Sequence, residues 1–358
     1  MKKRFGILTY HNANNYGAVL QAYALQRFLK DRFGEECVEV IDYQCEGVKR
    51  QRRFGYYMKG QNPLSGIIHF MGARKRINNI EHFCRNNISL SDKVESKSDL
   101  RNVSDNYDYL VSGSDQVWNR KWTGGEDTYL QDFYDDSKKK ASYAASFGIP
   151  ELLDEWKEDY QKLMADFSFR SVREEAGRNI IKNNFGLDSD VHVDPSVLLT
   201  GNQWDRVALR RTSINRPFVL AYMVPHQESV LRKAEEIAKT NDLKMVVVCR
   251  SLKKGSGVYK GTTSVEEVIA LFREAEYVVT NSFHGTAFSV IYQKKFFVEL
   301  NNKIGFNERS AQLLRRCGIL DIDHPDSIVD CTKAQWDSVQ KILNCERKRT
   351  EEYFEQMN

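Results

Sequence analysis

The chain has 358 residues, which is long for one hydrophobic core and fits two domains. Its 53 Lys and Arg residues against 49 Asp and Glu leave a formal net charge of +4, too small by itself to indicate a nucleic-acid-binding protein. Hydrophobic residues make up 41% of the chain, which describes an ordinary globular protein.

Short apolar segments alternate with amphipathic ones through the first half of the chain. The first predicted strand, Phe5–Tyr10, precedes a predicted helix over Ala18–Lys30 with apolar residues along one face. The later predicted strands of this half are Cys37–Tyr43, Tyr107–Ser112, Lys140–Ser146, Ser168–Arg173 and Val191–Val193. Predicted helices over Leu152–Ala165 and Glu174–Lys182 separate the last of these strands.

A polar, basic stretch over Gly201–Asn215 interrupts this alternation and predicts a boundary between domains at 1–210 and 211–358. The second half resumes with predicted strands at Phe218–Val224, Lys244–Cys249, Tyr277–Thr280 and Phe296–Leu300. Its predicted helices are Glu228–Lys239, Val265–Glu274, Thr286–Gln293, Glu308–Cys317 and Lys333–Tyr353. The alternation predicts an α/β fold of two Rossmann-like, doubly wound domains facing a cleft, with ligands at the carboxyl ends of the strands.

The segment Thr280–Ser289 carries the strongest chemical signal. It joins a predicted strand to a predicted helix, and helix N-termini bind anions, phosphates above all. Gly285 would let a ligand approach the backbone, and His284 adds a group that titrates near neutral pH. The alternative is a histidine that serves only its own loop.

Two other strand ends in the first half run into polar loops. Asn14-Asn15-Tyr16-Gly17 opens the first helix and forms either a plain turn or a tight loop over an anion. In Ser112-Gly113-Ser114-Asp115-Gln116-Val117-Trp118-Asn119, the Asp is either a proton-transfer carboxylate or an N-cap. Trp118 either stacks on a sugar or lies in the core.

Two arginines at strand ends or helix starts are candidates to bind an anionic ligand. Arg173 follows a predicted strand and either grips a carboxylate or phosphate or pairs with a nearby Glu. Arg309 opens the helix after the last predicted strand, where the alternative is an exposed side chain without function. The pair Asp194-Pro195 is typical of a rigid turn.

Residues from Val48 to Ile80 include no acid. They hold eight basic residues with Phe54, Tyr56 and Tyr57 between them: Lys49, Arg50, Arg52, Arg53, Lys59, Arg74, Lys75 and Arg76. Such an insertion suits an anionic membrane surface or a lipid diphosphate head group. Single-stranded nucleic acid uses the same mixture, but nothing else in the chain supports it, and a solvated loop is the alternative.

The seven cysteines are dispersed and never spaced as C-x-x-C, which is typical of reduced thiols in a cytosolic protein. The first residues lack the apolar stretch of a signal peptide, and no apolar run has the length of a membrane span. We therefore expect a cytoplasmic protein, with the basic insertion favouring the inner face of the membrane.

Four segments together resemble, in order, the polysaccharide pyruvyl transferase family. They are Asn14–Gly17, Ser112–Asn119, Ser171–Glu174 and Ser282–Gly285, and the resemblance spans residues 5 to about 315. It implies a glycosyltransferase-B-like pair of domains that moves pyruvate from phosphoenolpyruvate onto two hydroxyls of a sugar, giving a cyclic ketal and phosphate. Many relatives carry Arg-Leu-His-Gly where this chain has Ser-Phe-His-Gly. Either Arg173 or Arg309 then supplies the positive charge, or the donor differs.

This reaction needs an acid for the methylene carbon, a positive clamp for the donor and a base for the acceptor hydroxyl. We expect His284 as the acid or phosphate partner and Asp115 as the base. The expected donor clamp is Arg173, Arg309 and the helix start at Gly285-Thr286. The remaining expected substrate-binding residues are Asn14, Asn15, Tyr16, Gly17, Ser114, Gln116, Trp118 and Ser282.

The first domain is expected to bind the glycan acceptor, whether lipid-linked or not, and the second the donor. No cofactor or metal is expected, because no cluster with metal-ligand spacing is visible. Two alternatives stay open: a glycosyltransferase that uses a nucleotide sugar, and a glycan-binding protein without catalysis.

Overall fold

The computed structural model describes residues 3–60, 62–250, 257–300, 308–321, 324 and 327–357. The chain divides into two compact units, each made of separate stretches of sequence. The first unit comprises Met1–Lys59, Ile80–Leu198 and Glu346–Asn358, and the second comprises Gly60–Asn79 and Leu199–Cys345. The division thus lies at 198 and 199 instead of the predicted 210 and 211, and the chain also crosses between the units near residues 60, 80 and 346.

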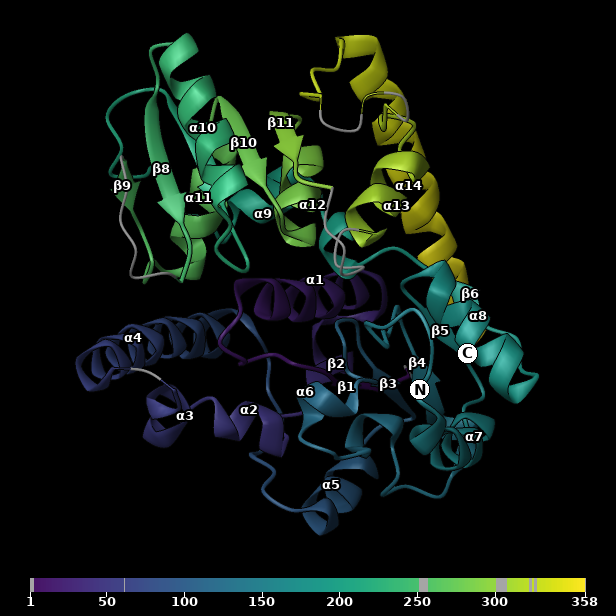
Figure 1. The fold of residues 1–358 in the computed structure, drawn as a ribbon. Coiled ribbons are helices and arrows are strands. Elements are labelled where there is room, and N and C mark those ends of the chain that lie inside the picture. Colours follow the sequence, from purple (N-terminus) through teal and green to yellow (C-terminus); the bar gives the residue numbers. More distant parts are fainter. Residues whose placement is uncertain are drawn as a thin grey trace. The chain divides into compact units, whose positions relative to one another are not determined.

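The first unit is built on a parallel sheet with the strand order β2-β1-β3-β4 (Figure 1). Two isolated parallel bridges, Ala141 to Phe169 and Ala145 to Val172, continue the pairing toward the two-stranded β5-β6 sheet. Its strands are β1 Phe5–Leu8, β2 Val38–Val40, β3 Tyr109–Ser112, β4 Lys140–Ser142, β5 Ser171–Val172 and β6 Asp190–Val191. All of β1 is buried, as expected of a strand that is covered on both faces.

Helices cover this sheet and fill the long connection between β2 and β3. They are α1 Tyr16–Phe33, α2 Glu46–Arg50, α3 Phe54–Met58, α5 Lys97–Ser104, α6 Arg120–Thr123, α7 Lys157–Ala165 and α8 Glu175–Phe185. The 25-residue α4, Pro63–Asn87, begins in the second unit and ends in the first. The basic insertion at 48–80 is therefore largely helical, and the alternative of a solvated loop is wrong.

The end of the chain completes the core of the first unit. The last long helix, α14 Lys333–Glu355, passes from the second unit into the first. Phe354 is fully buried, and its ring centroid lies 5.9 Å from that of Phe5 in β1. The Tyr353 hydroxyl donates to the carbonyl of Ser142 in β4 at 2.7 Å.

The second unit is built on a parallel sheet with the order β11-β10-β7-β8-β9 (Figure 1). Its strands are β7 Phe218–Tyr222, β8 Lys244–Val248, β9 Val258–Tyr259, β10 Tyr277–Thr280 and β11 Lys295–Val298. Its helices are α9 Gly201–Asp205, α10 Glu228–Thr240, α11 Val265–Glu274, α12 Phe283–Ile291 and α13 Glu308–Arg316.

Successive residues of the central strand β7 face opposite sides of this sheet, as strand geometry requires. Val219 and Ala221 pack in one apolar cluster with α10 residues such as Ala234. Tyr222 points to the other face, where its ring lies 5.2 Å from that of Phe272 in α11. Both faces are thus covered by helices.

The two parallel sheets confirm the predicted α/β fold with two Rossmann-like domains. The four sequence segments singled out above lie at or shortly after the ends of β1, β3, β5 and β10. These strands end at Leu8, Ser112, Val172 and Thr280. Each segment therefore lies at the carboxyl edge of its own sheet, where α/β proteins bind ligands. The predicted cleft between the domains stays a prediction.

Candidate functional site

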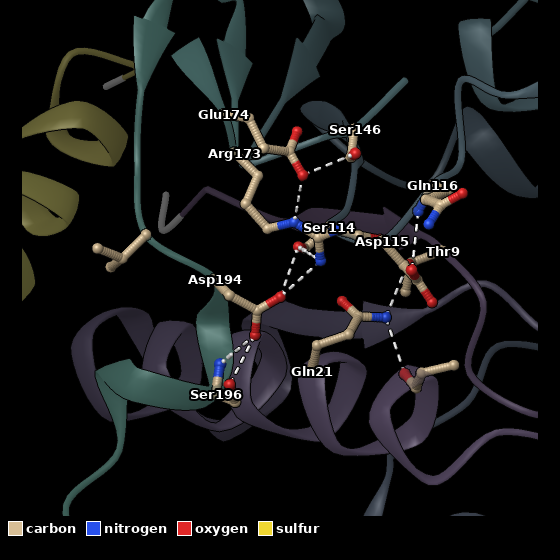
Figure 2. A network of polar contacts seen from close by, with 12 residues as sticks. Thr9, Gln21, Ser114, Asp115, Gln116, Ser146, Arg173, Glu174, Asp194 and Ser196 are labelled. Atoms are coloured by element: carbon tan, nitrogen blue, oxygen red, sulfur yellow. Dashed lines mark hydrogen bonds and ion pairs between the residues drawn. The ribbon is translucent and has the colours of Figure 1, made fainter. Parts of the chain in front are cut away.

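A buried arginine between two carboxylates forms the centre of a polar network in the first unit (Figure 2). Arg173 follows β5 directly and is 5% exposed. Its Nε donates to Oε1 of Glu174 at 3.0 Å, and its Nη1 donates to Oδ2 of Asp194 at 2.9 Å. The ion-pair alternative raised by the sequence is therefore present in the structure.

Asp194 accepts hydrogen bonds from three other groups of this network. Its Oδ2 accepts from the Ser114 hydroxyl at 3.0 Å, and its Oδ1 accepts from the backbone N and the hydroxyl of Ser196 at 2.9 and 2.7 Å. The side chain has no exposed surface. Asp194 therefore does more than shape a turn: it holds Ser114, at the end of β3, next to Arg173.

The charge of Arg173 is offset inside the protein. Burial by itself lowers the pKa of a guanidinium, but the carboxylates of Glu174, Asp194 and Asp115 outweigh this effect and raise the pKa of Arg173. Arg173 thus stays charged, and its Nη1 also lies 3.4 Å from the Ser114 hydroxyl. We interpret it as a residue that positions the Ser114-Asp115 loop; its expected role in a donor clamp stays a prediction.

Asp115 has a positive φ, which is uncommon for residues other than glycine, asparagine and aspartate. Its φ is 78°, in the left-handed region. Its Oδ1 accepts from the backbone N of Gln116 at 2.9 Å, and its carbonyl accepts from the backbone N of Ser146 at 3.0 Å. Such strain is concentrated at functional sites, so Asp115 remains the candidate base of the first unit.

Trp118 has no exposed surface, which contradicts its expected stacking on a sugar. Its Nε1 donates to the carbonyl of Tyr129 at 3.0 Å, and its ring packs 5.3 Å from that of Phe147. The core alternative is correct, because the chain turns inward directly after the polar loop. Gln116, by contrast, is half-buried, and its side chain packs against Gly148.

The loop between β1 and α1 contacts other residues of the first unit. Asn15 is the N-cap of α1, and its Oδ1 accepts from the backbone N of Gly17 at 3.1 Å. Asn14 Nδ2 donates to the Tyr57 hydroxyl at 3.4 Å, and Tyr16 is 7% exposed. These contacts favour the plain turn for Asn15, whereas ligand binding by the loop stays a prediction.

Gln21 and Thr9, which sequence reasoning did not single out, connect this loop to Ser114 (Figure 2). Gln21 in α1 has no exposed surface, and its Nε2 donates to the Thr9 hydroxyl at 2.9 Å. The Thr9 hydroxyl in turn donates to the Ser114 carbonyl at 2.8 Å. In the sequence, the signal that could have indicated this role is the position of Gln21 among the apolar residues of the predicted first helix.

His11 pairs with Asp42 behind the same loop. The two are 3.0 Å apart, from Nε2 to Oδ1, and the His11 side chain is 1% exposed. This hydrogen bond is the main cause of a lowered pKa of Asp42. The His11 side chain of this pair is buried, so we interpret the pair as a structural contact that holds the loop between β1 and α1 in place.

In the second unit, α12 begins earlier than predicted. Phe283 is its first residue and Ser282 occupies the N-cap position, so His284 and Gly285 lie inside the first turn. The backbone N of Thr286 donates to the Ser282 carbonyl at 3.0 Å. This first intrahelical bond occupies the Thr286 amide, and the amides of 283–285 precede it. The expected donor clamp at the helix start Gly285-Thr286 stays a prediction.

Gly285 is required by packing between α12 and β10. A Cβ at this position would lie 2.1 Å from Oγ1 of Thr280. That hydroxyl donates to the carbonyl of Tyr222 at 2.7 Å and accepts from the backbone N of Ser282 at 3.0 Å. The surface that Gly285 approaches is therefore a threonine of its own sheet, and its expected contact with a ligand stays a prediction.

Arg309 lies beside the start of α12. Its guanidinium carbon is 6.0 Å from the ring centroid of Phe283. The Thr286 and Ser310 hydroxyls are 3.0 Å apart and join the first turns of α12 and α13. The structure thus brings together the predicted Arg309 and the helix start that carries Ser282 and the 7% exposed His284.

Asn281 supports this helix start and was not predicted. Its Oδ1 accepts from the backbone N of Val224, and its Nδ2 donates to the carbonyl of Pro225 and to Oε1 of Gln227, all at 2.9 Å. It therefore fixes the loop after β7 against the loop after β10.

No group of three or more His, Cys, Asp or Glu suited to a metal ion occurs in the described part of the chain.

Two Rossmann-like sheets, each with polar residues at its carboxyl edge, define an α/β protein, a class in which ligands bind at the strand ends. The sequence model of the polysaccharide pyruvyl transferase family matches residues 15–302. The chain therefore belongs to this family. A comparison with curated protein sequences finds no significant match.

A comparison with solved structures finds several similar chains at low sequence identity. A putative UDP-N-acetylglucosamine 2-epimerase from Listeria monocytogenes is 10% identical, with a TM-score of 0.48 and 98% of each chain covered. The UDP-N-acetylglucosamine 2-epimerase from Rickettsia bellii is 9% identical, with a TM-score of 0.49, over 99% of this chain and 96% of that one. The glycosyltransferase SsfS6 from Streptomyces sp. SF2575 is 9% identical, with a TM-score of 0.44, over 97% and 96%.

Proposed function

We propose that this transferase moves pyruvate from phosphoenolpyruvate onto two hydroxyls of a glycan sugar, forming a cyclic ketal in the biosynthesis of a cell-surface or capsular polysaccharide. Family membership supports the reaction class. The observation that carries the choice of donor is the position of Arg309 over Phe283, beside the first turn of α12.

In this proposal the donor binds at the start of α12. Phosphoenolpyruvate carries a carboxylate and a phosphate, and a helix N-terminus with an adjacent guanidinium suits such an anion. Arg309 would supply the charge that relatives carry two residues before the histidine, where this chain has Ser282. Arg173 is less suited to this role, because two internal carboxylates already bind it.

The proposed chemistry balances with the side chains present. One acceptor hydroxyl bonds to C2 of the enol, Asp115 takes its proton, and His284 donates a proton to the methylene carbon, which becomes a methyl group. The second hydroxyl then bonds to C2 as the C–O bond to phosphate breaks, and its proton leaves with the phosphate. No cofactor takes part in this scheme.

A donor screen by calorimetry tests the proposal. Phosphoenolpyruvate should bind, and should release phosphate when a glycan acceptor is added, while nucleotide sugars stay inert. Turnover of a nucleotide sugar would show a glycosyltransferase instead. Tight glycan binding with neither donor consumed would show a glycan-binding protein.

The substitution Arg309→Lys tests the donor site itself. Lysine keeps the charge but loses the planar fork, so we expect weaker phosphoenolpyruvate binding in calorimetry. The matched control is Arg315→Lys in the same helix, where the arginine is half exposed and pairs with Glu308. Equal donor affinity in both variants would place the anion site elsewhere.

A further inference from the structure

The first turns of α4 expose an unusual set of apolar side chains. Leu64 and Met71 are 67% and 65% exposed, and Ile67 and Ile68 are 41% and 45% exposed. Their spacing of three, four and seven residues puts all four on one face of the helix. Of the nine large hydrophobic side chains that are exposed in the described part of the chain, these four lie on this one helix.

The rest of α4 follows the usual amphipathic pattern. Ala73 and Ile77 are 1% and 6% exposed on the buried face, and Ile80 and Phe83 continue that face into the first unit. The exposed residues after Met71 are all polar: Arg74, Lys75, Asn78, His82, Arg85 and Asn86. The apolar exposed face, which we call the α4 face, is therefore confined to Leu64, Ile67, Ile68 and Met71.

The α4 face belongs to a well-formed helix. Pro63 occupies the first helical position, where its fixed φ is favourable, and Asn62 Oδ1 accepts from the backbone N of Leu64 at 3.0 Å. Within the second unit, Arg76 Nη1 donates to the carbonyl of Gly261 at 2.8 Å, and Asn79 Nδ2 donates to that of Thr262 at 2.9 Å. The helix is thus fixed on its other side while the α4 face stays exposed.

Positive charge borders the α4 face. Arg74 and Lys75 lie one turn further along the helix, both are exposed, and neither forms an ion pair with a described residue. The acid-free stretch from Val48 to Ile80 carries eight positive charges, more than the formal +4 of the whole chain, so the remainder of the chain is net acidic. Within the second unit, the α4 face is thus bordered by two exposed cations of its own helix.

We propose that the α4 face docks on an anionic membrane surface, with the four aliphatic side chains among the acyl chains and Arg74 and Lys75 at the head groups. A helix with an apolar face bordered by cations lies in such an interface. No helix in the described part of the chain is long and apolar enough to cross a membrane. The sequence had pointed to the charges and aromatic residues of this region, but not to the α4 face.

A second copy of the chain fits the α4 face less well. Two-fold symmetric pairing presents the same patch on both copies, and because this stretch of the chain has no acid, the partner's α4 face offers no opposite charge to Arg74 and Lys75. An anionic lipid surface instead offers opposite charge to every cation at the border. Charge complementarity therefore favours the membrane.

Vesicle co-sedimentation of the full chain tests this proposal without any donor, so its outcome is independent of the proposed reaction. The protein should pellet with vesicles of phosphatidylcholine mixed with phosphatidylglycerol, and less at high salt, but not with phosphatidylcholine alone. Leu64→Ser with Met71→Ser should weaken binding on the order of tenfold per side chain. Arg74→Gln with Lys75→Gln should weaken it about fivefold per charge.

Matched controls distinguish the α4 face from general surface effects. Leu209→Ser removes an exposed leucine elsewhere, and Lys162→Gln with Lys341→Gln removes two exposed charges, so neither should change vesicle binding. Ile68→Trp should shift its emission to the blue only with anionic vesicles, which keeps the test valid if the serine variant fails to fold.

Three results would overturn the proposal. The first is equal pelleting with both vesicle types, or none with either. The second is unchanged binding of the folded serine variant, or no spectral shift of Ile68→Trp. The third is a dimer, seen in analytical ultracentrifugation, that dissociates in the serine variant, because the α4 face would then be an interface between copies.

Discussion

Replacing Arg173 by methionine removes the cation at the centre of the first-unit network while keeping most of the side-chain volume. The change leaves Glu174 and Asp194 as buried carboxylates, with side chains 10% and 0% exposed. Breaking a buried ion pair in this way typically costs roughly 3–5 kcal/mol of unfolding free energy.

We expect the loss of unfolding free energy to lie at the lower end of this range, about 3 kcal/mol, because both carboxylates keep other hydrogen bonds. Asp194 keeps three donors after the change, from the hydroxyls of Ser114 and Ser196 and the backbone N of Ser196. Glu174 keeps the Ser146 hydroxyl at 2.9 Å. A loss of this size is a large fraction of the roughly 5–15 kcal/mol that stabilises a typical protein.

Urea unfolding at neutral pH measures this loss, with Arg178→Met as the matched control. Arg178 lies in α8, is half exposed and pairs with Glu175, so its removal should change the unfolding free energy by less than about 0.5 kcal/mol. Adding Asp194→Asn to Arg173→Met should restore part of the lost stability, because it removes one unpaired charge. A wild-type urea midpoint together with lost phosphoenolpyruvate binding would refute this reasoning and make Arg173 a donor ligand.

Three further predictions concern other residues. His284→Asn should fold normally and lose roughly 100-fold to 10,000-fold in turnover; phosphate release near the wild-type rate would exclude the histidine from the mechanism. Gly285→Ala should lower the unfolding free energy by about 1–3 kcal/mol through overpacking, whereas Gly55→Ala, with open space around it, should have little effect in the same urea titration. The hydrogen bond to His11 lowers the pKa of Asp42, so the stability that this pair contributes is present above the usual aspartate pKa and is lost as pH falls through the lowered value. Asp42→Asn should therefore flatten the acid side of a curve of unfolding free energy against pH. An unchanged slope would contradict this.

The repeating strands and helices were predictable because their apolar periodicity comes from burial on both faces of a parallel sheet. Predictions such as Tyr277–Thr280 and Val265–Glu274 match β10 and α11 residue for residue. The helix α4 was not predicted, because its first turns place leucine, isoleucine and methionine on the exposed face. Hydrophobic periodicity detects a helix by the contrast between its two faces, and that contrast is missing there.

The candidate site was only partly predictable for a related reason. A strand end followed by polar residues predicts where functional groups gather, and Ser114, Asp115 and Arg173 do lie together after the ends of β3 and β5. The same pattern does not say which side chains turn inward, so Trp118 was expected to meet a ligand although it is buried. Packing distances, such as that between Gly285 and Thr280, depend on contacts that a linear sequence does not contain.

The discontinuous first unit has a consequence for the order in which the chain folds during its synthesis. Domains made of one continuous stretch fold as they leave the ribosome, those nearest the N-terminus first. Here Phe5, in the first strand, packs against Phe354, and Ser142 accepts a hydrogen bond from Tyr353. The first unit therefore completes its core only after α14 has been synthesised. Until then Phe5 can pack against Phe33 and Tyr109 but lacks its contact with Phe354.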